Sequence, residues 1–214
     1  MNIIFDFDGV ILNSHKVKTK AFYEVFKSYG NSIGVKARKF HENNIGKSRY
    51  FKFKYIFKNI LNKKITKNEL ARMDKNFNFT VEKKIRYMFP TENLLKFLKN
   101  KKKYHNFYIS TGTPQKKIVN ILKEKKLFFF FKKIYGSPRS KLQHLNEIKK
   151  KNIQSLFIGD SYEDYKVSKQ ANINFLLKMN SENLSLRKKK NIKKINSFKY
   201  LEGHIKFLNL KYKI

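Results

Sequence analysis

Two carboxylates near the amino terminus have the spacing of a catalytic pair. Asp6 and Asp8 end an apolar run that begins at Asn2, and Gly9 follows them directly. A glycine at this point permits a sharp turn, and such a turn would aim both carboxylates into one mouth. One carboxylate could then attack a phosphorus atom while the other moves a proton, as phosphoryl transfer through a covalent intermediate requires.

This chemistry needs positive charge, which one further motif could supply as a lysine and another could supply by binding a metal cation. Lys141 follows residues 136–140, and Asp160 and Asp164 come after an apolar run that ends at Ile158. A carboxylate that attacks a phosphate needs neutralisation by a divalent cation on hard oxygen ligands and by a fixed positive side chain. Asp160 and Asp164 could hold Mg²⁺, and Lys141 could be the fixed cation.

A hydroxyl and a glycine follow another short apolar run. Thr111 and Gly112 come directly after residues 107–110, and a helix is expected from residue 115. The Thr111 hydroxyl could bind a phosphoryl group. Backbone amides that begin at Gly112 could receive phosphate oxygens at the amino terminus of the helix.

The lysine motif contains a second candidate. Arg139 lies two residues before Lys141 and could take its place. We favour Lys141, because it is expected to open the following helix.

The predicted elements gather these motifs at one edge of a sheet. Each motif alone is common at a turn or a helix cap, but functional residues of an open parallel sheet lie where its strands end. Beyond Pro90, short apolar runs alternate with helical patterns, which predicts an α/β fold with a parallel sheet and helices on both faces. The predicted strands lie near residues 2–8, 107–110, 134–135, 155–158 and 174–177, and the helices near residues 92–99, 115–125, 141–150, 163–171 and 198–208.

The segment before Pro90 has a different pattern. Helical periodicity covers residues 14–30, 47–62 and 68–88, and no convincing strand lies among them. We therefore expect residues 14–89 to be a helical insertion. The basic stretch 188–194 is expected to be a solvated loop.

The four motifs, in their order along the chain, resemble those of the haloacid dehalogenase-like hydrolase superfamily, of the phosphoglycolate phosphatase and β-phosphoglucomutase type. The resemblance covers nearly the whole chain. Residues 1–13 and 90–214 resemble its Rossmann-like core, and residues 14–89 resemble its inserted helical cap domain. Asp8 favours phosphate chemistry, because the dehalogenases of the superfamily lack this second acid.

This resemblance implies a role for each motif residue. Asp6 would be the nucleophile that forms an aspartyl-phosphate, and Asp8 the general acid and then the general base. Thr111 would bind the transferring phosphoryl group, and Lys141 would bridge nucleophile and phosphate. The implied Mg²⁺ ligands are the Asp6 carboxylate, the Asp8 main-chain carbonyl, Asp160, and Asp164 directly or through water. Asn13 departs from the pattern, where relatives commonly have Asp, and we interpret it as structural.

The insertion is expected to select the substrate. Residues 46–53 lie between two predicted helices, where similar enzymes place a specificity loop. Ser48 and Arg49 suit an anionic or polyol leaving group, and Gly112 is the expected contact from the core. With 50 basic residues, however, a nearby cation also arises by chance.

The histidines show no metal-ligand spacing. We expect His15, His105, His144 and His204 to be structural. His41 and Glu42 are expected to be surface residues.

The composition raises a non-enzymatic alternative. A formal charge of +35 is typical of proteins that bind nucleic acid. The alternative is therefore a protein that has the same fold and binds nucleic acid through its positive surface. Yet 44 of the 50 basic residues are Lys and 6 are Arg, as codon bias produces, whereas selection for phosphate or base contacts retains Arg. The charged residues Asp6, Asp8, Lys141 and Asp160 are expected in one site, where their burial is unfavourable. A function that only binds nucleic acid gives no reason for this arrangement, so it also favours an enzyme. We therefore expect no specific nucleic-acid partner.

The remaining sequence features predict where the protein works and on what. The chain has no cysteine, no apolar run long enough to span a membrane and no signal-peptide pattern. We expect a soluble cytoplasmic protein, a monomer or weak dimer, that binds no membrane. The predicted function is a Mg²⁺-dependent phosphatase of a small phosphorylated substrate, either a sugar phosphate or a phosphorylated acid. A sugar-phosphate mutase is the alternative, since it uses the same core residues with a hydroxyl in place of water as acceptor.

Overall fold

The computed structural model describes residues 1–149 and 153–210. Its centre is a six-stranded sheet in the order β3-β2-β1-β4-β5-β6, and all neighbouring strands are parallel. The predicted α/β fold is confirmed. The strands are β1 (Asn2–Phe5), β2 (Asn106–Pro114), β3 (Lys133–Ser137), β4 (Ser155–Gly159), β5 (Asn174–Lys178) and β6 (Lys194–Ile195).

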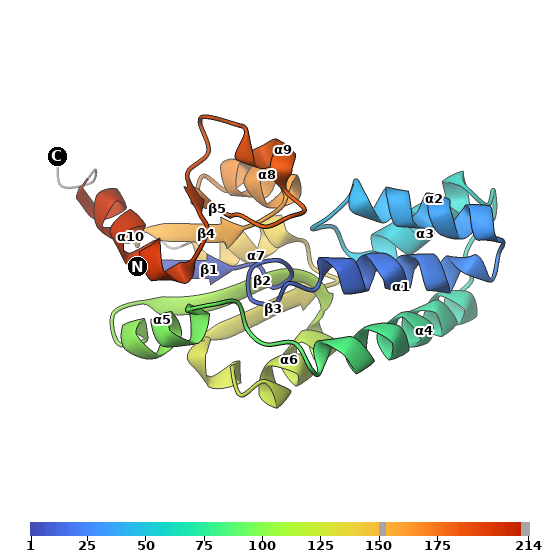
Figure 1. Ribbon diagram of the computed structural model, residues 1–214, viewed down its shortest axis with the longest axis horizontal. Coiled ribbons are helices and arrows are strands. Elements are labelled where there is room, and N and C mark those ends of the chain that lie inside the picture. Colours follow the sequence, from blue (N-terminus) through green and yellow to red (C-terminus); the bar gives the residue numbers. More distant parts are fainter. Residues whose placement is uncertain (150–152, 211–214) are drawn as a thin grey trace.

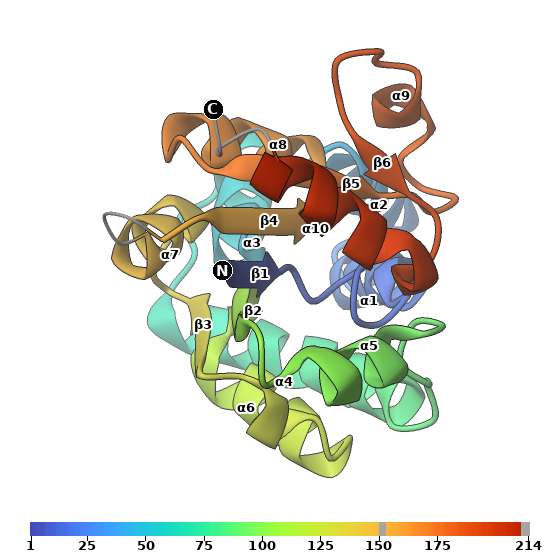
Figure 2. The same ribbon diagram turned by 90° about the vertical axis from the view of Figure 1, so that its left-hand side faces the viewer.

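Helices cover both faces of this sheet, as predicted. The apolar side chains of α7 (Lys141–Ile148) and α8 (Tyr162–Gln170) pack on one face. Those of α5 (Leu94–Lys101), α6 (Gln115–Glu124) and α10 (Leu201–Leu210) pack on the other. Figure 2 shows α7 and α10 on opposite sides of the central strands. A short helix, α9 (Leu184–Arg187), follows β5.

Alternation along β1 explains why its sequence is continuously apolar. Ile3 and Phe5 belong to one core cluster, where the Phe5 ring meets the Phe107 ring edge-on at 5.8 Å between centroids. Ile4 belongs to the cluster on the opposite face, with Phe157. A strand that is buried on both faces needs apolar side chains at every position.

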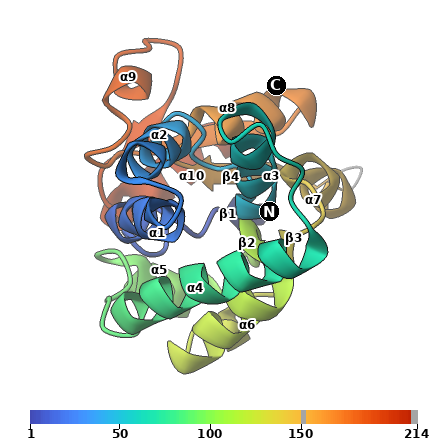
Figure 3. The ribbon, with the colours of Figure 1, turned by 90° about the vertical axis from the view of Figure 1, so that its right-hand side faces the viewer.

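Four helices stand beyond the carboxyl ends of the strands. They are α1 (His15–Lys27), α2 (Asn31–Glu42), α3 (Arg49–Asn59) and α4 (Lys67–Ile85). Figure 1 shows these helices to the right of the sheet, and Figure 3 views the molecule from their side. The rings of Phe22, Phe53 and Phe77 join α1, α3 and α4, with centroids 5.2 to 6.0 Å apart. Aromatic side chains from distant sequence positions thus form the core of this helical region.

Helix α2 was not predicted, because its sequence carries a glycine in its interior and another before its start. Gly30 precedes the helix with a φ of +118°, a conformation that favours glycine. At Gly34, an added Cβ would lie 3.0 Å from the Tyr23 ring of α1. The close approach of α1 and α2 therefore requires the glycine that weakens the helical pattern.

Other boundaries also differ from the prediction. Strand β2 runs on to Pro114 with an irregular register against β3, instead of ending at Ser110. The predicted loop at 188–194 meets a short sixth strand, β6, at its end. The last helix begins with a 3-10 turn at Phe198–Tyr200. Lys150, placed in the helix at 141–150, and residues 211–214 of the predicted core lie outside the described residues.

No helix within 1–149 or 153–210 combines the length and the apolar character that crossing a membrane requires.

Candidate active site

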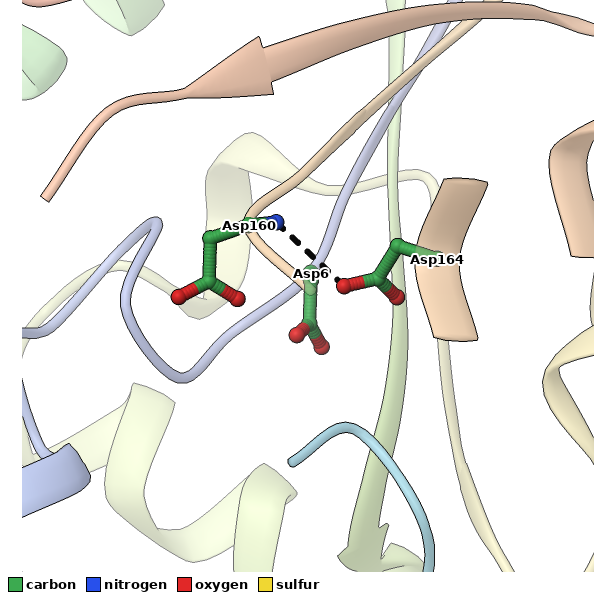
Figure 4. A group of neighbouring side chains, drawn as sticks. All are labelled: Asp6, Asp160 and Asp164. Carbon is green, nitrogen blue, oxygen red and sulfur yellow. Dashed lines mark hydrogen bonds between the residues drawn. The ribbon is translucent and has the colours of Figure 1, made fainter. Parts of the chain in front are cut away.

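Asp6 and Asp160 lie close together because they follow neighbouring strands. β1 pairs with β4 so that Phe5 lies beside Ile158. Asp6 is the first residue after β1, and Asp160 is the first residue after β4. Asp164 comes from the first turn of α8. One oxygen from each of the three carboxylates lies within 4.8 Å of the others. Figure 4 shows the three side chains grouped together. β1 and β4 also flank the point where the strand order reverses, which is where open parallel sheets place ligands.

Lys141 supplies a fixed cation to this cluster. It is the first residue of α7, whose start is held by a capping box between Ser140 and Gln143. Its Nζ lies 3.0 Å from Asp6 Oδ1 and 2.5 Å from Asp164 Oδ1. Burial alone would lower the pKa of Lys141, but the Asp164 and Asp6 carboxylates outweigh it and raise the pKa above its ordinary value. Lys141 is therefore charged at physiological pH.

Arg139 lies away from the cluster. Its half-exposed guanidinium pairs with Glu147 at 2.6 Å. Of the two basic candidates in this motif, the structure brings Lys141 to Asp6.

Lys141 alone does not supply enough positive charge to keep the buried Asp6 carboxylate ionised. Asp6 is 2% exposed, and burial raises its pKa well above the ordinary value. The Lys141 ammonium opposes this rise, while the carboxylates of Asp164 and Asp160 add to it. The ionised form, which a nucleophile must have, thus needs a further cation nearby.

Asp160 has an oxygen free for such a cation. Its Oδ2 lies 2.5 Å from His15 Nε2 and accepts a hydrogen bond from Asn180 Nδ2 at 2.6 Å. Its Oδ1 is buried and has no hydrogen-bond partner among the residues described. Hard divalent cations prefer carboxylate oxygens, so Asp160 together with Asp6 fits Mg²⁺.

Asp164 is occupied with neighbouring groups. Its Oδ2 accepts hydrogen bonds from the Ser161 hydroxyl at 2.6 Å, the Ser161 amide at 3.1 Å and the Asp160 amide at 3.3 Å. Its Oδ1 accepts from Lys141. Asp164 therefore orients both Asp160 and Lys141, and its predicted part as a metal ligand stays a prediction.

Asp8 has its own cation, which the sequence did not point out. Lys18 Nζ, from α1, lies 2.5 Å from Asp8 Oδ2, and Ser14 Oγ donates to Asp8 Oδ1. Burial alone would raise the pKa of Asp8, but the charges of Lys18 and His15 and these hydrogen bonds lower it to about 2. In this arrangement Asp8 is ionised.

His15, which was expected to be structural, contacts Asp160 at the candidate site. Burial lowers its pKa, but the Asp160 carboxylate outweighs burial and the net pKa is raised. His15 and Lys18 stand three residues apart in the first turn of α1, so both reach the same mouth. This spacing directly after the Asp6 motif is the signal that could have found them.

Gly9 allows His15 and Asp160 to meet. Its φ is +76°, in the left-handed region that favours glycine. An added Cβ would overlap the Asp160 carboxylate and the His15 ring. The backbone turn and the space for this contact both require the residue to be glycine.

The end of β2 forms another wall of the site. Thr111 is fully buried, and its Oγ1 accepts a hydrogen bond from the Thr113 amide at 3.1 Å. Gly112 and Thr113 line the cavity above Asp6. Helix α6 begins at Gln115, as predicted, and Gly112 lies three residues before it, in the part of β2 that continues beyond Ser110. The role of the Gly112 amide in binding phosphate oxygens stays a prediction.

The predicted specificity residues differ in their positions. Arg49 lines the cavity and is 8% exposed; its Nε lies 2.8 Å from Asp74 Oδ1, and its Nη1 donates to Asn78 at 2.7 Å. Ser48 precedes α3 and is not among the residues that line the cavity. Its amide nitrogen instead packs near Gly112, where an added Cβ would lie 3.3 Å away.

The predicted surface position of His41 is wrong. It was expected at the surface, but it is 4% exposed and lines the cavity. Its neighbour Glu42 is exposed, as expected. His41 was missed because α2, which carries it, was not predicted.

A family model described as haloacid dehalogenase-like hydrolase matches residues 3–178, a span that contains all four motifs. No curated protein matches significantly.

Solved structures share this fold over almost the whole chain. A β-phosphoglucomutase from Clostridium difficile is 19% identical, with a TM-score of 0.70 and 98% coverage of both chains. A predicted phosphoglycolate phosphatase from Haemophilus somnus is 17% identical, with a TM-score of 0.70, covering 95% of this chain and 97% of that one. The hydrolase YfnB from Bacillus subtilis, solved bound to magnesium, is 17% identical, with a TM-score of 0.66 and the same coverages. The resemblance of the motifs is confirmed by the family match, and this chain belongs to the haloacid dehalogenase-like hydrolase family.

Proposed function

We propose that this protein is a Mg²⁺-dependent phosphatase that hydrolyses a small phosphorylated metabolite through an aspartyl-phosphate on Asp6. The observation that carries the proposal is the Asp6 carboxylate, which is buried between Lys141 and Asp160 with Asp8 at the same mouth. Similar solved structures include a phosphatase and a phosphomutase, whose names denote phosphate-ester chemistry.

In the first step, an Asp6 oxygen attacks phosphorus and the bond between phosphorus and the ester oxygen breaks. Asp8 gives its proton to the departing oxygen. Lys141 and the backbone around Gly112 and Thr113 hold the phosphoryl oxygens.

In the second step, Asp8 takes a proton from water as the water oxygen attacks phosphorus. The bond between phosphorus and Asp6 breaks, and inorganic phosphate leaves. The enzyme returns to its starting state, because Asp8 has regained the proton that it gave.

Mg²⁺, when bound, supplies positive charge for the phosphoryl oxygens and for the ionised form of Asp6. Asp6, Asp160 and the Asp8 carbonyl would hold it, with Asp164 orienting Asp160. The similar hydrolase YfnB was solved bound to magnesium, which supports this choice of ion.

Lys18 links substrate binding to the proton on Asp8. In the structure, Lys18 keeps Asp8 ionised, whereas the first step needs a protonated Asp8. A phosphate dianion in the cavity competes for the Lys18 ammonium. As Lys18 turns toward the substrate, Asp8 loses its counter-charge and gains affinity for a proton.

The helices α1 to α4 would serve as a cap domain, residues 14–89, over a core of residues 1–13 and 90–214. Both parts line the cavity, with Asp6 and Lys141 from the core and Arg49 from the helices. Arg49 would contact the leaving group, Gly112 would contact the phosphoryl oxygens, and Ser48 would position the loop. We place the enzyme in the cytoplasm as a monomer or weak dimer, with no membrane and no specific nucleic acid among its partners.

A panel of phosphomonoesters assayed with Mg²⁺ and with excess chelator tests this function. We expect turnover of at least one small ester with Mg²⁺, and none with chelator or with the Asp6→Asn variant. Full activity in chelator, or in Asp6→Asn, would contradict the proposal.

The mutase alternative also has an observation in its favour, because the similar β-phosphoglucomutase covers 98% of this chain. The two functions differ in the acceptor of the phosphoryl group. Phosphorus NMR of a sugar phosphate with the enzyme separates them: a phosphatase releases inorganic phosphate, and a mutase produces a positional isomer.

A further inference from the structure

A buried lysine on the helical side of the cavity takes no part in the steps above. Lys52, on α3, is 2% exposed and lines the same cavity as Asp6. Its Nζ lies 3.0 Å from Nδ1 of His41, on α2, and 5.4 Å from the centre of the Phe22 ring, on α1. Three helices thus converge on one buried ammonium group.

The other buried lysine and arginine that line the cavity have carboxylate partners. Lys141 pairs with Asp6 and Asp164, and Arg49 pairs with Asp74. Within residues 1–149 and 153–210, no carboxylate forms an ion pair with Lys52. Burial and the nearby Lys18 charge lower the pKa of Lys52 to about 7. A cation without a counter-charge is costly to bury, so the fold keeps Lys52 at the expense of stability.

His41 adds a donor that has no acceptor. When Nδ1 accepts from Lys52, the ring proton lies on Nε2. This Nε2 is buried and has no hydrogen-bond partner in the described parts of the chain. Stacking on Phe22, at 4.3 Å between centroids, fixes the plane of the imidazole. Lys52 and His41 therefore present donors for which the described part of the protein supplies no anion.

We propose that Lys52 and His41 form a second anion site, which receives a negatively charged group of the substrate other than the transferred phosphoryl group. This inference rests on the proposed phosphatase function and narrows its substrate to phosphomonoesters that carry a carboxylate or a second phosphate. A substrate with only neutral hydroxyl groups leaves Lys52 unpaired. Such a substrate is therefore disfavoured.

Matched pairs of ligands test the site without turnover. The Asp6→Asn protein with Mg²⁺ is titrated calorimetrically with phosphoglycolate and with 2-hydroxyethyl phosphate, which differ in the carboxylate. A second pair, propane-1,3-diol bisphosphate and 3-hydroxypropyl phosphate, differs in the second phosphate. The titrations are repeated after adding Lys52→Met and, as a control, Lys54→Met, which removes an exposed lysine from the same helix.

We expect the anionic member of one pair to bind about 10- to 100-fold more tightly, as a charged hydrogen bond provides. The pair that shows this preference identifies the second group as carboxylate or phosphate. Lys52→Met should remove most of the preference, and Lys54→Met should retain it. Lys52→Gln serves if Lys52→Met does not fold.

Equal binding of both members in both pairs overturns the second anion site, and this comparison needs no change at Lys52. A preference that survives Lys52→Met or Lys52→Gln also overturns it. The phosphatase function fails separately: in that case the anionic ligands are discriminated, but unmodified protein with Mg²⁺ hydrolyses no phosphomonoester.

Discussion

Lys18 Nζ lies 2.5 Å from Asp8 Oδ2, so the first helix after β1 places a cation directly on a carboxylate of the first motif. The same ammonium donates to Thr113 Oγ1 at 2.9 Å, at the end of β2. The helical region is therefore joined to the catalytic edge of the sheet through a charge that sets the protonation of Asp8.

Removing this charge should change the titration of Asp8. Burial raises the pKa of Asp8, and the Lys18 charge lowers it. In Lys18→Met this lowering is lost, so the pKa of Asp8 should rise from about 2 by about one to three pH units. Carbon NMR of protein labelled at aspartate carboxyls, without metal, measures the change. Lys20→Met, an exposed lysine on the same helix, should leave the titration unaltered. An unchanged pKa in Lys18→Met would show that Lys18 does not control Asp8.

Lys141 and Arg139 should differ sharply when each is replaced by Met. Lys141→Met leaves two buried carboxylates without their cation, which should cost about 3–5 kcal/mol of stability and abolish turnover. Arg139→Met removes an exposed ion pair, which contributes little to stability, and should retain turnover. Urea unfolding and a phosphatase assay measure both effects. Similar losses in the two variants would contradict the assignment of Lys141.

Mg²⁺ should stabilise the folded protein through Asp160. At about 100 times its dissociation constant, a ligand that binds only the folded state adds about 2.7 kcal/mol to the free energy of unfolding. We expect this gain in the unmodified protein and in Glu124→Gln, an exposed carboxylate, and a much smaller gain in Asp160→Asn. Unfolding curves with and without Mg²⁺ provide the measurement. An equal gain in Asp160→Asn would place the ion elsewhere.

The buried Lys52 should make stability rise with pH. The pKa of Lys52 is about 7 in the folded protein, and its ordinary value of 10.5 applies in the unfolded chain. Between pH 7 and 10.5 the unfolded chain therefore binds more protons than the folded protein. The free energy of unfolding therefore gains up to about 1.4 kcal/mol per pH unit in this window from Lys52 alone. Unfolding titrations from pH 7 to 10 should show a shallower slope for Lys52→Met than for Lys54→Met. Parallel slopes would mean that Lys52 is not the titrating group.

The residues at the strand ends could be predicted because a parallel sheet brings the carboxyl ends of its strands to one edge. Asp6, Lys141 and Asp160 meet there through the register of β1 and β4 and the position of α7. Lys18 and Lys52 could not be found in this way. Their positions depend on how α1 and α3 dock above the sheet, which packing between distant residues decides. In a chain with 44 lysines, residue type alone does not mark them either.

The central claim is that Asp6 carries the phosphoryl group during turnover. The Asp8→Asn variant, mixed with p-nitrophenyl phosphate and Mg²⁺, tests it most directly, because this leaving group needs no proton and the loss of Asp8 slows attack by water. Samples are quenched in acid and the peptides are analysed by mass spectrometry. We predict a phosphoryl group on Asp6, and none when Asp6→Asn is added. Release of nitrophenol with no phosphoryl group on Asp6, or with the group on another residue, would contradict this account.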